Sequence, residues 1–331
     1  MHIAYLEQPN CTLCALPGLI GEPTLGIHIV LTGPVPQIPD NLIDSQTMNK
    51  QLQHNSKENG TIAFIGGGNM AVSLISGLVA DGYDPQKILV SDPDAEKLAA
   101  LAGRFRIKSA PNNDEAVRNA DVVVLAIKPQ VMEEVTRSLT GAIQNSKPLV
   151  ISIAAGVREE SLQQWLGGDV ALVRTMPNTP AMIQAGASVL HAGPGVSGEQ
   201  KDLAESILRA VGLTRWVDDE GLMDAVTALS GSGPAYFFLI MEAMEAAAVE
   251  LGIPADSARL LTLQTALGAA KMALESREGP AILRQQVTSP GGTTECALQT
   301  LEEGGLRELF KQALTDARDR SVELSELLGN S

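Results

Sequence analysis

The sequence predicts an α/β protein in which a mostly parallel sheet over residues 60–218 precedes an all-helical domain over 219–331. Short runs of Val, Ile and Leu alternate with helical segments in the first region, which is typical of a parallel sheet buried on both faces. Beyond Asp218 these runs stop, while the helical period of apolar residues continues. Aromatic residues make up only 3% of the chain, which suits close helix packing better than a β-sandwich core.

The expected elements of the first region alternate regularly. A buried strand is expected at 61–65, followed by a glycine turn and an amphipathic helix over 69–81. Further strands are expected at 87–91, 107–109, 121–127, 148–153 and 170–174. A final strand pair at 187–191 and 214–217 is expected to flank a helix over 197–211 and to close the domain.

The second region is expected to contain only helices, at 219–229, 233–252, 255–276, 280–286 and 293–327. The stretch Leu260–Ala273 is apolar on most of its circumference, and such a helix must be buried. Burial against a second subunit is the preferred interpretation, which makes this a dimerisation domain. The alternative is the centre of a monomeric bundle, but the region offers little bulk to surround that helix.

Composition and charge exclude several kinds of partner. A formal net charge of −15 repels nucleic acid, and no run of Lys or Arg makes a local exception. No apolar stretch reaches the roughly 18 residues of a membrane span, and the first residues lack the pattern of a signal peptide. We therefore expect no nucleic-acid partner, no membrane partner and a cytoplasmic location.

Residues 1–59 form an extension with scattered prolines and no helical or strand period, which predicts disorder or a loosely attached arm. Met48 stands shortly before the first strand and is an alternative start of the natural product, which would then lack the upstream residues. Cys11 and Cys14 form a C-x-x-C pair, but a zinc site needs four ligands and no second pair follows. We expect no metal site.

The turn after the first strand carries the clearest chemical signal. Its residues, Gly66-Gly67-Gly68-Asn69-Met70-Ala71, fit the pattern G-x-G-x-x-A between a strand and a helix. Gly66 permits a tight turn, Gly68 lets the backbone approach a pyrophosphate, and Ala71 allows close helix–strand packing. Free N–H groups at the helix start attract phosphate. The region is therefore predicted to be a Rossmann-type dinucleotide-binding domain.

Two residues near this turn have alternative interpretations. Asp92 ends the second strand, where a ribose would lie, but the Ser91–Asp94 segment can also be a turn that caps the next helix. Asn113 precedes a helix and is either a cap or a cofactor ligand, with the cap favoured by residue type alone. Both roles of Asp92 can coexist.

Further loops are expected beside the nicotinamide half of the cofactor, because ligands of such sheets bind beyond the carboxyl ends of the strands. Ala126–Pro129 and Ile153–Val157 end two strands, and Lys128 is the one basic group so placed. Asn178 lies in a stiff loop between two prolines and can present its amide to a ring amide or to substrate.

Two segments of the helical region carry unusual composition. Ser230–Pro234 divides the sheet from the helices, and a flexible hinge is the alternative to a functional role for this segment. Thr288–Thr294 has glycines beside several hydroxyls at a helix start, which resembles a nest for a carboxylate in outline.

These motifs, in this order, resemble pyrroline-5-carboxylate reductase over roughly residues 60–327. The similar strings are IGGGNMA at 65–71, AIKP at 126–129, SIAAGV at 152–157, MPNTP at 176–180, DAVTALSGSGPAY at 224–236 and TSPGGTT at 288–294. The resemblance implies a cytoplasmic enzyme of proline biosynthesis with a Rossmann domain, a helical dimerisation domain, and interlocked dimers that often assemble into decamers. The extension at 1–59 has no counterpart in the family, and Asp92 stands where many members have an uncharged residue.

The resemblance also implies site residues. The cofactor, NADPH or NADH, is expected to contact Ile65, Gly66, Gly67, Gly68, Asn69, Met70, Asn113, Ala126, Ile127, Lys128, Pro129, Ile153, Ala154 and Ala155. Asp92 and Asn178 join this set from their positions in the sequence. The substrate, 1-pyrroline-5-carboxylate, is expected to contact Ser289, Gly291, Gly292, Thr293 and Thr294.

The implied reaction is hydride transfer from nicotinamide to the imine carbon of the substrate, with a proton delivered to or already on its nitrogen. Ser289 and Thr294 are the candidate catalytic residues, and Thr294 is expected nearest the imine nitrogen, although solvent can equally supply the proton. Two rivals remain. A β-hydroxyacid enzyme needs a lysine or histidine that residues 219–240 lack, and a non-catalytic regulator would bind cofactor without turnover.

Overall fold

The computed structural model describes residues 60–329, so the extension and its cysteine pair lie outside the described residues. The described chain forms an eight-stranded sheet with the order β3-β2-β1-β4-β5-β6-β7-β8. The strands are β1 Ile62–Ile65, β2 Ile88–Ser91, β3 Lys108–Ser109, β4 Val122–Leu125, β5 Leu149–Ser152, β6 Leu172–Met176, β7 Gly186–Ala192 and β8 Gly212–Trp216. All neighbouring strands are parallel except β6 and β7, so the predicted mostly parallel sheet is confirmed.

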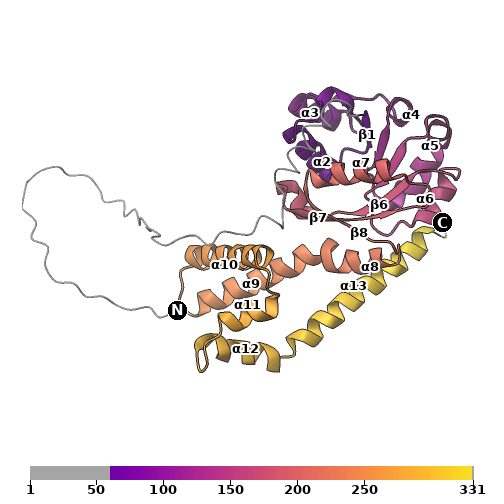
Figure 1. The fold of residues 1–331 in the computed structure, drawn as a ribbon. Coiled ribbons are helices and arrows are strands. Elements are labelled where there is room, and N and C mark those ends of the chain that lie inside the picture. Colours follow the sequence, from indigo (N-terminus) through magenta and orange to yellow (C-terminus); the bar gives the residue numbers. More distant parts are fainter. Residues whose placement is uncertain (1–59, 330–331) are drawn as a thin grey trace, which may run out of the picture. The chain divides into compact units, whose positions relative to one another are not determined.

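Helices connect the strands and cover the sheet on both faces (Figure 1). They are α2 Asn69–Ala80, α3 Ala95–Phe105, α4 Asn113–Arg118, α5 Met132–Ser146, α6 Glu159–Trp165 and α7 Gly198–Arg209. Short 3-10 turns, η1 Pro85–Lys87, η2 Pro129–Val131 and η3 Thr179–Ile183, lie between them. The predicted sequence of strand, turn and helix is confirmed, with boundaries that differ by a few residues.

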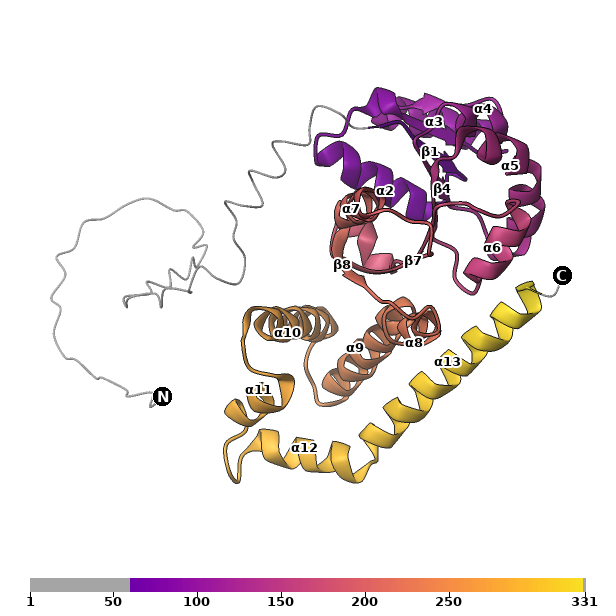
Figure 2. The ribbon, with the colours of Figure 1, turned by 45° about the vertical axis from the view of Figure 1, so that its right-hand side comes forward.

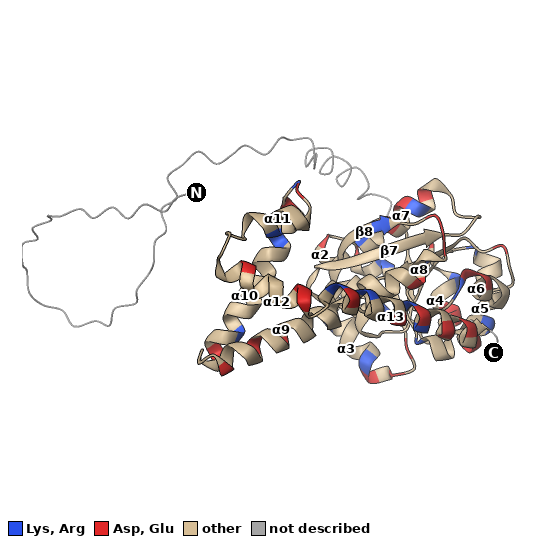
Figure 3. Ribbon diagram, turned by 90° about the horizontal axis from the view of Figure 1, so that it is seen from below, with Lys and Arg blue, Asp and Glu red and all other residues tan. Residues whose placement is uncertain are grey.

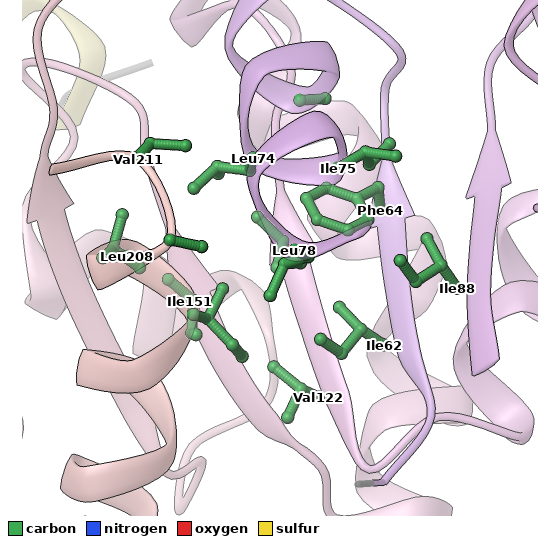
Figure 4. Close-up of a cluster of buried hydrophobic side chains, with 14 of the residues drawn as sticks. Ile62, Phe64, Leu74, Ile75, Leu78, Ile88, Val122, Ile151, Leu208 and Val211 are labelled. Carbon is green, nitrogen blue, oxygen red and sulfur yellow. The ribbon is translucent and has the colours of Figure 1, made fainter. Parts of the chain in front are cut away.

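The core has two layers, because successive residues of a strand point to opposite faces of the sheet. On β1, Ile62 and Phe64 pack in one cluster with α2 and α7, whereas Ala63 and Ile65 pack in a second cluster with α4, α5 and α6. Figure 4 shows Phe64 between Ile75 of α2 and Ile88 of β2 in the first layer. These side chains are almost completely buried, which fixes the register of the central strands.

The second region contains only helices and turns among its described residues, as predicted. These are α8 Leu222–Val226, a π-helical turn η4 Thr227–Gly231, α9 Gly233–Glu250, α10 Ala255–Glu275, α11 Pro280–Gln286, α12 Thr293–Glu303 and α13 Leu306–Gly329. The helix expected over 219–229 is present with shifted bounds, as α8 and the π turn that follows it. The single helix expected over 293–327 was wrong: the segment is two helices, because Gly305 adopts a φ of +75° that interrupts the helix.

Ser230–Pro234 is not a flexible hinge, because these residues complete the π turn and begin α9. The Ser232 N–H donates to the Thr227 carbonyl at 2.8 Å, and the Tyr236 hydroxyl donates to the Ala228 carbonyl at 3.0 Å. A Cβ on Gly231 would collide with the Cε of Met176, so β6 and the π turn are closely packed.

The helices α9 and α10 expose a large apolar surface in the single chain. Figure 3 shows fewer charged residues on these two helices than on α13, which carries many of both signs. The most exposed large side chains are Phe237 63%, Phe238 64% and Leu239 65% on α9, and Leu260 68%, Leu267 62% and Leu274 82% on α10. Within residues 60–329 the apolar helix is therefore not buried at the centre of a bundle, which was the alternative to a subunit interface. No helix among residues 60–329 is long and apolar enough to cross a membrane.

Candidate active site

The glycine turn lies at the carboxyl edge of the sheet, where three strands meet. Gly66 adopts a φ of +97°, and its N–H donates to the Ser91 carbonyl of β2 at 2.8 Å. A Cβ on Gly66 would lie 2.5 Å from the Ala126 carbonyl oxygen after β4, which no side chain can tolerate. At Gly68 the nearest such atom is that same oxygen at 3.9 Å, an ordinary contact distance, so this side of the glycine is uncrowded. Gly68 is also the N-cap of α2 and provides no side-chain bond, which leaves helix N–H groups available to an anion.

Asp92 lies beneath this turn and is held by three hydrogen bonds. Its Oδ2 accepts from the Gly67 N–H and from the Lys97 ammonium, both at 2.8 Å, and its Oδ1 accepts from the Asp94 N–H at 3.0 Å. Burial acts to raise the pKa of Asp92, but the bonds from Lys97, Gly67 and Asp94 together lower this pKa below its usual value. Asp92 is therefore ionised at neutral pH, and Lys97 balances its charge.

The helix cap that was considered for Asp92 is supplied by Asp94. The Asp94 Oδ1 accepts from the Glu96 and Lys97 N–H groups at 3.1 and 3.0 Å. Asp92 shapes the turn before that helix and does not cap it. The expectation that Asn113 is a cap was also wrong, since α4 begins at Asn113 and Asn112 accepts the capping bond from the Glu115 N–H at 2.8 Å.

The other predicted cofactor residues follow strands that run parallel to β1, so they share its edge of the sheet. Ala126–Pro129 follows β4, and the Ala126 N–H donates to the Ile65 carbonyl at 2.8 Å. Ile153–Ala155 follows β5, and the Ile153 N–H donates to the Leu125 carbonyl at 3.3 Å. Lys128 is exposed beside η2. The fold thus brings these loops together with the glycine turn.

Asn178 follows β6 and uses its amide in contacts within the chain. Its Oδ1 accepts from the Ala187 N–H of β7 at 2.9 Å, and its Nδ2 donates to the carbonyl and the hydroxyl of Ser230, both at 3.3 Å. The residue therefore ties the end of β6 to β7 and to the π turn. A direct contact of Asn178 with the cofactor stays a prediction.

The predicted carboxylate turn lies between α11 and α12. Gly291 adopts a φ of +69°, its N–H donates to Glu295 Oε2 at 2.6 Å, and Gly292 is the N-cap of α12 without a side-chain bond. Ser289 and Thr293 are exposed, and Thr294 is half-buried. Within residues 60–329, the hydrogen bonds of this turn lead to the turn itself or to α11 and α12. The single chain does not join it by such bonds to the glycine turn.

Sequence reasoning missed an ion pair between the two regions. Arg174 lies in the middle of β6 and is only 6% exposed, and its guanidinium donates to the Glu220 carboxylate. A charged residue within an apolar strand needs an acidic partner, so Arg174 itself was the signal. Nothing local to the sequence identifies Glu220 as that partner.

Comparisons with known proteins show which family this chain belongs to. Residues 220–324 match the family described as pyrroline-5-carboxylate reductase dimerisation, and residues 61–156 match the NADP oxidoreductase, coenzyme F420-dependent, family. Pyrroline-5-carboxylate reductase of Pseudomonas aeruginosa is 53% identical over 268 residues, which are 81% of this chain and 98% of that protein. The Pasteurella multocida enzyme is 45% identical, again over 81% of this chain and 98% of its own length.

Solved structures give the same result. The pyrroline-5-carboxylate reductase of Coxiella burnetii is 50% identical with a TM-score of 0.78, and the match covers 81% of this chain and 99% of that one. The Plasmodium falciparum pyrroline carboxylate reductase, solved with NADP bound, is 26% identical with a TM-score of 0.72 and the same coverage.

Proposed function

The chain belongs to the pyrroline-5-carboxylate reductase family, and from that premise we propose which of its residues carry out the reaction. It is an NAD(P)H-dependent oxidoreductase that reduces the C=N bond of 1-pyrroline-5-carboxylate and yields proline. The observation that best supports this activity in the chain itself is the glycine turn between β1 and α2. Its open face at Gly68 and the uncapped start of α2 suit a pyrophosphate.

The dinucleotide is held by loops at the carboxyl edge of the sheet. A reduced nicotinamide supplies the hydride when it is bound. The Gly66–Met70 turn receives the pyrophosphate, and Ala126–Pro129 with Ile153–Ala155 provides a small-residue surface for the ring. Asp92 bonds to the turn at the place where the ribose would lie. Lys97 is half-exposed beside Asp92 and balances its charge.

The substrate carboxylate is held by the turn between α11 and α12. Ser289, Thr293 and Thr294 supply hydroxyls there, and Gly291 and Gly292 supply backbone N–H groups. The Thr294 hydroxyl donates a hydrogen bond at the imine nitrogen or relays a proton to it. A bound carboxylate fixes the ring plane, and orientation of this kind accounts for much of the rate of such a reaction.

The site is completed between two copies of the chain. The hydrogen bonds of the carboxylate turn are local, and the neighbouring α9 and α10 expose apolar side chains that a second copy would cover. A dimer is thus the smallest active unit. Assembly of dimers into decamers and a cytoplasmic location complete the proposal, and both rest on the resemblance to the family. The domain limits that we propose are 60–218 for dinucleotide binding and 219–331 for dimerisation and substrate binding.

Replacement of Thr294 by Val tests the substrate turn, with NADPH oxidation in the presence of 1-pyrroline-5-carboxylate as the assay. The change removes one hydroxyl at constant volume. We expect a loss in kcat/KM of about tenfold, which equals roughly 1.4 kcal/mol, with NADPH affinity unchanged. Thr300→Val on the same helix is the control, because the Thr300 hydroxyl donates to the Cys296 carbonyl of that helix. An unchanged kcat/KM for Thr294→Val would remove this residue from the site.

A further inference from the structure

The turn Ile153–Glu159 joins β5 to α6 and carries the small residues assigned to the nicotinamide ring. Its conformation depends on Gly156, which adopts a φ of +74°. Ala154 is 7% exposed and Val157 1% exposed, so one side of the turn packs on the core of the nucleotide-binding region. Its other side is contacted by two separate parts of the helical region.

Glu220 makes the first of these contacts, immediately before α8. Its Oε1 accepts a hydrogen bond from the Glu159 N–H at 2.6 Å, at the first residue of α6. The same oxygen accepts from the Arg174 guanidinium, whose side chain is 8% exposed. Arg158, the N-cap of α6, offers no side-chain cap, so a residue of the helical region fills that role. The end of the turn is thus bound to β6 through one carboxylate.

The last turns of α13 make the second contact, at the middle of the turn. A Cβ on Gly156 would lie 3.7 Å from the Leu328 Cδ1 and from the Ser325 Oγ, so the helix packs directly against this glycine. Ser325 is 2% exposed, and its small side chain allows the close approach. Leu328 packs on the core cluster behind the turn. Figure 2 shows α13 running from α12 to a position beside α6.

The same stretch of α13 is anchored to α8. The Ser321 hydroxyl donates to Asp224 Oδ1 at 2.6 Å, and Ser321 is 6% exposed. The two contacts on the turn are therefore connected through α8, which begins two residues after Glu220. A displacement of the helical region would move the turn at two points.

We propose that Glu220 and the Leu328 end of α13 are positioning residues for hydride transfer, because they set the place of the Ile153–Glu159 turn from the helical region. This inference rests on the proposed function, which assigns the turn to the nicotinamide ring. The proposal assigns neither residue a direct contact with substrate or cofactor. Through these two residues, the position of the dimerisation helices determines the position of the turn at the nicotinamide ring.

Glu220→Gln tests the first contact, since it removes the charge opposite Arg174 at constant size. Glu205→Gln is the matched control: Glu205 is similarly exposed, pairs with Arg209 and accepts from the Trp216 indole, at the outer edge of the sheet. We expect Glu220→Gln to lower kcat per folded enzyme about tenfold, because small displacements of a reacting group are costly. The substrate KM should change little, and the primary deuterium isotope effect from C4-deuterated NADPH should equal or exceed that of the wild type.

Leu328→Ala tests the second contact independently. It can refute the inference even if the Glu220→Gln variant does not fold. Leu327→Ala is its control, because Leu327 is 65% exposed on the same turn of α13. If either test variant has the same kcat per folded enzyme as its control, the positioning role is overturned. The proposed function still stands in that case, because it depends only on turnover by the wild type. A wild-type chain that binds NADPH but does not oxidise it with 1-pyrroline-5-carboxylate overturns the proposed function, and this inference with it.

Discussion

Asp92 braces the glycine turn and the start of α3 at the same time. Its two oxygens receive the Gly67 and Asp94 N–H groups and the Lys97 ammonium, so little of its hydrogen-bonding capacity remains for a ribose. Its charge still lies beside the place where the 2′-phosphate of NADPH would bind, a group with about −1.5 to −2 charges. Lys97 offsets that charge only while it stays paired with Asp92.

We expect Asp92→Ser to shift the ratio of kcat/KM values toward NADPH by about tenfold, because the acid disappears and Lys97 is released toward the phosphate. The control is Asp94→Ser, which retains a capping side chain on α3 and removes a charge that does not contact the glycine turn. Initial rates with NADPH and with NADH, measured side by side, check this. A ratio that stays constant would mean that Asp92 only braces the turn.

Residue-level predictions were accurate where the backbone dictates the residue type. The glycine at position 66 was predictable because the turn requires a positive φ and a close approach to Ala126. The cap of α4 was misplaced because Asn112 and Asn113 are the same residue type, and only geometry separates N-cap from first helical residue. The interpretation of Asp92 as a ribose ligand or a cap did not foresee Lys97 as its partner.

At the scale of elements, the break between α12 and α13 is the main departure from the expected helix over 293–327. Gly304 and Gly305 occupy the break, and Gly305 has a φ of +75°. Glycine inside a helical pattern is either tolerated or ends the helix, and the pattern alone does not decide between these outcomes. The strands were predictable to within a few residues, because buried parallel strands leave an uninterrupted Val, Ile and Leu signature.

Gly305→Ala should lower the free energy of unfolding by about 1 kcal/mol or more, because a side chain at this positive φ is strained. Gly103→Ala provides the contrast. Gly103 lies inside α3 with open space around a new Cβ, so alanine should raise the free energy of unfolding by roughly 0.5–1 kcal/mol. Denaturant unfolding of both variants checks the pair. Equal effects in the two variants would contradict the assigned role of Gly305.

At the scale of the whole molecule, the apolar face of α9 and α10 requires a partner. The sequence predicted this from the apolar circumference of Leu260–Ala273, and the single chain leaves these side chains exposed. The arrangement of the site could not be predicted in the same way. Which copy supplies the carboxylate turn depends on contacts between chains, and no local pattern encodes those.

Leu267→Glu should dissociate the dimer, because it would place an unpaired charge in an apolar interface at a cost of several kcal/mol. Leu213→Glu is the matched control, since Leu213 is 56% exposed on β8 and Leu267 62% exposed on α10. Sedimentation at micromolar concentration distinguishes monomer from dimer. A Leu267→Glu variant that remains an active dimer would place the interface elsewhere.

The central claim, a reductase site shared between two chains, is tested most directly by a mixed dimer. One copy carries Gly68→Asp, which fills the open face of the glycine turn with a charge that repels pyrophosphate, and the other carries Thr294→Glu, which repels the substrate carboxylate. Each parent dimer should be inactive. Coexpressed chains with different tags, purified through both, should oxidise NADPH with 1-pyrroline-5-carboxylate at about half the wild-type rate per dimer, because one of the two sites is intact. A doubly purified mixed dimer as inactive as its parents would contradict the account.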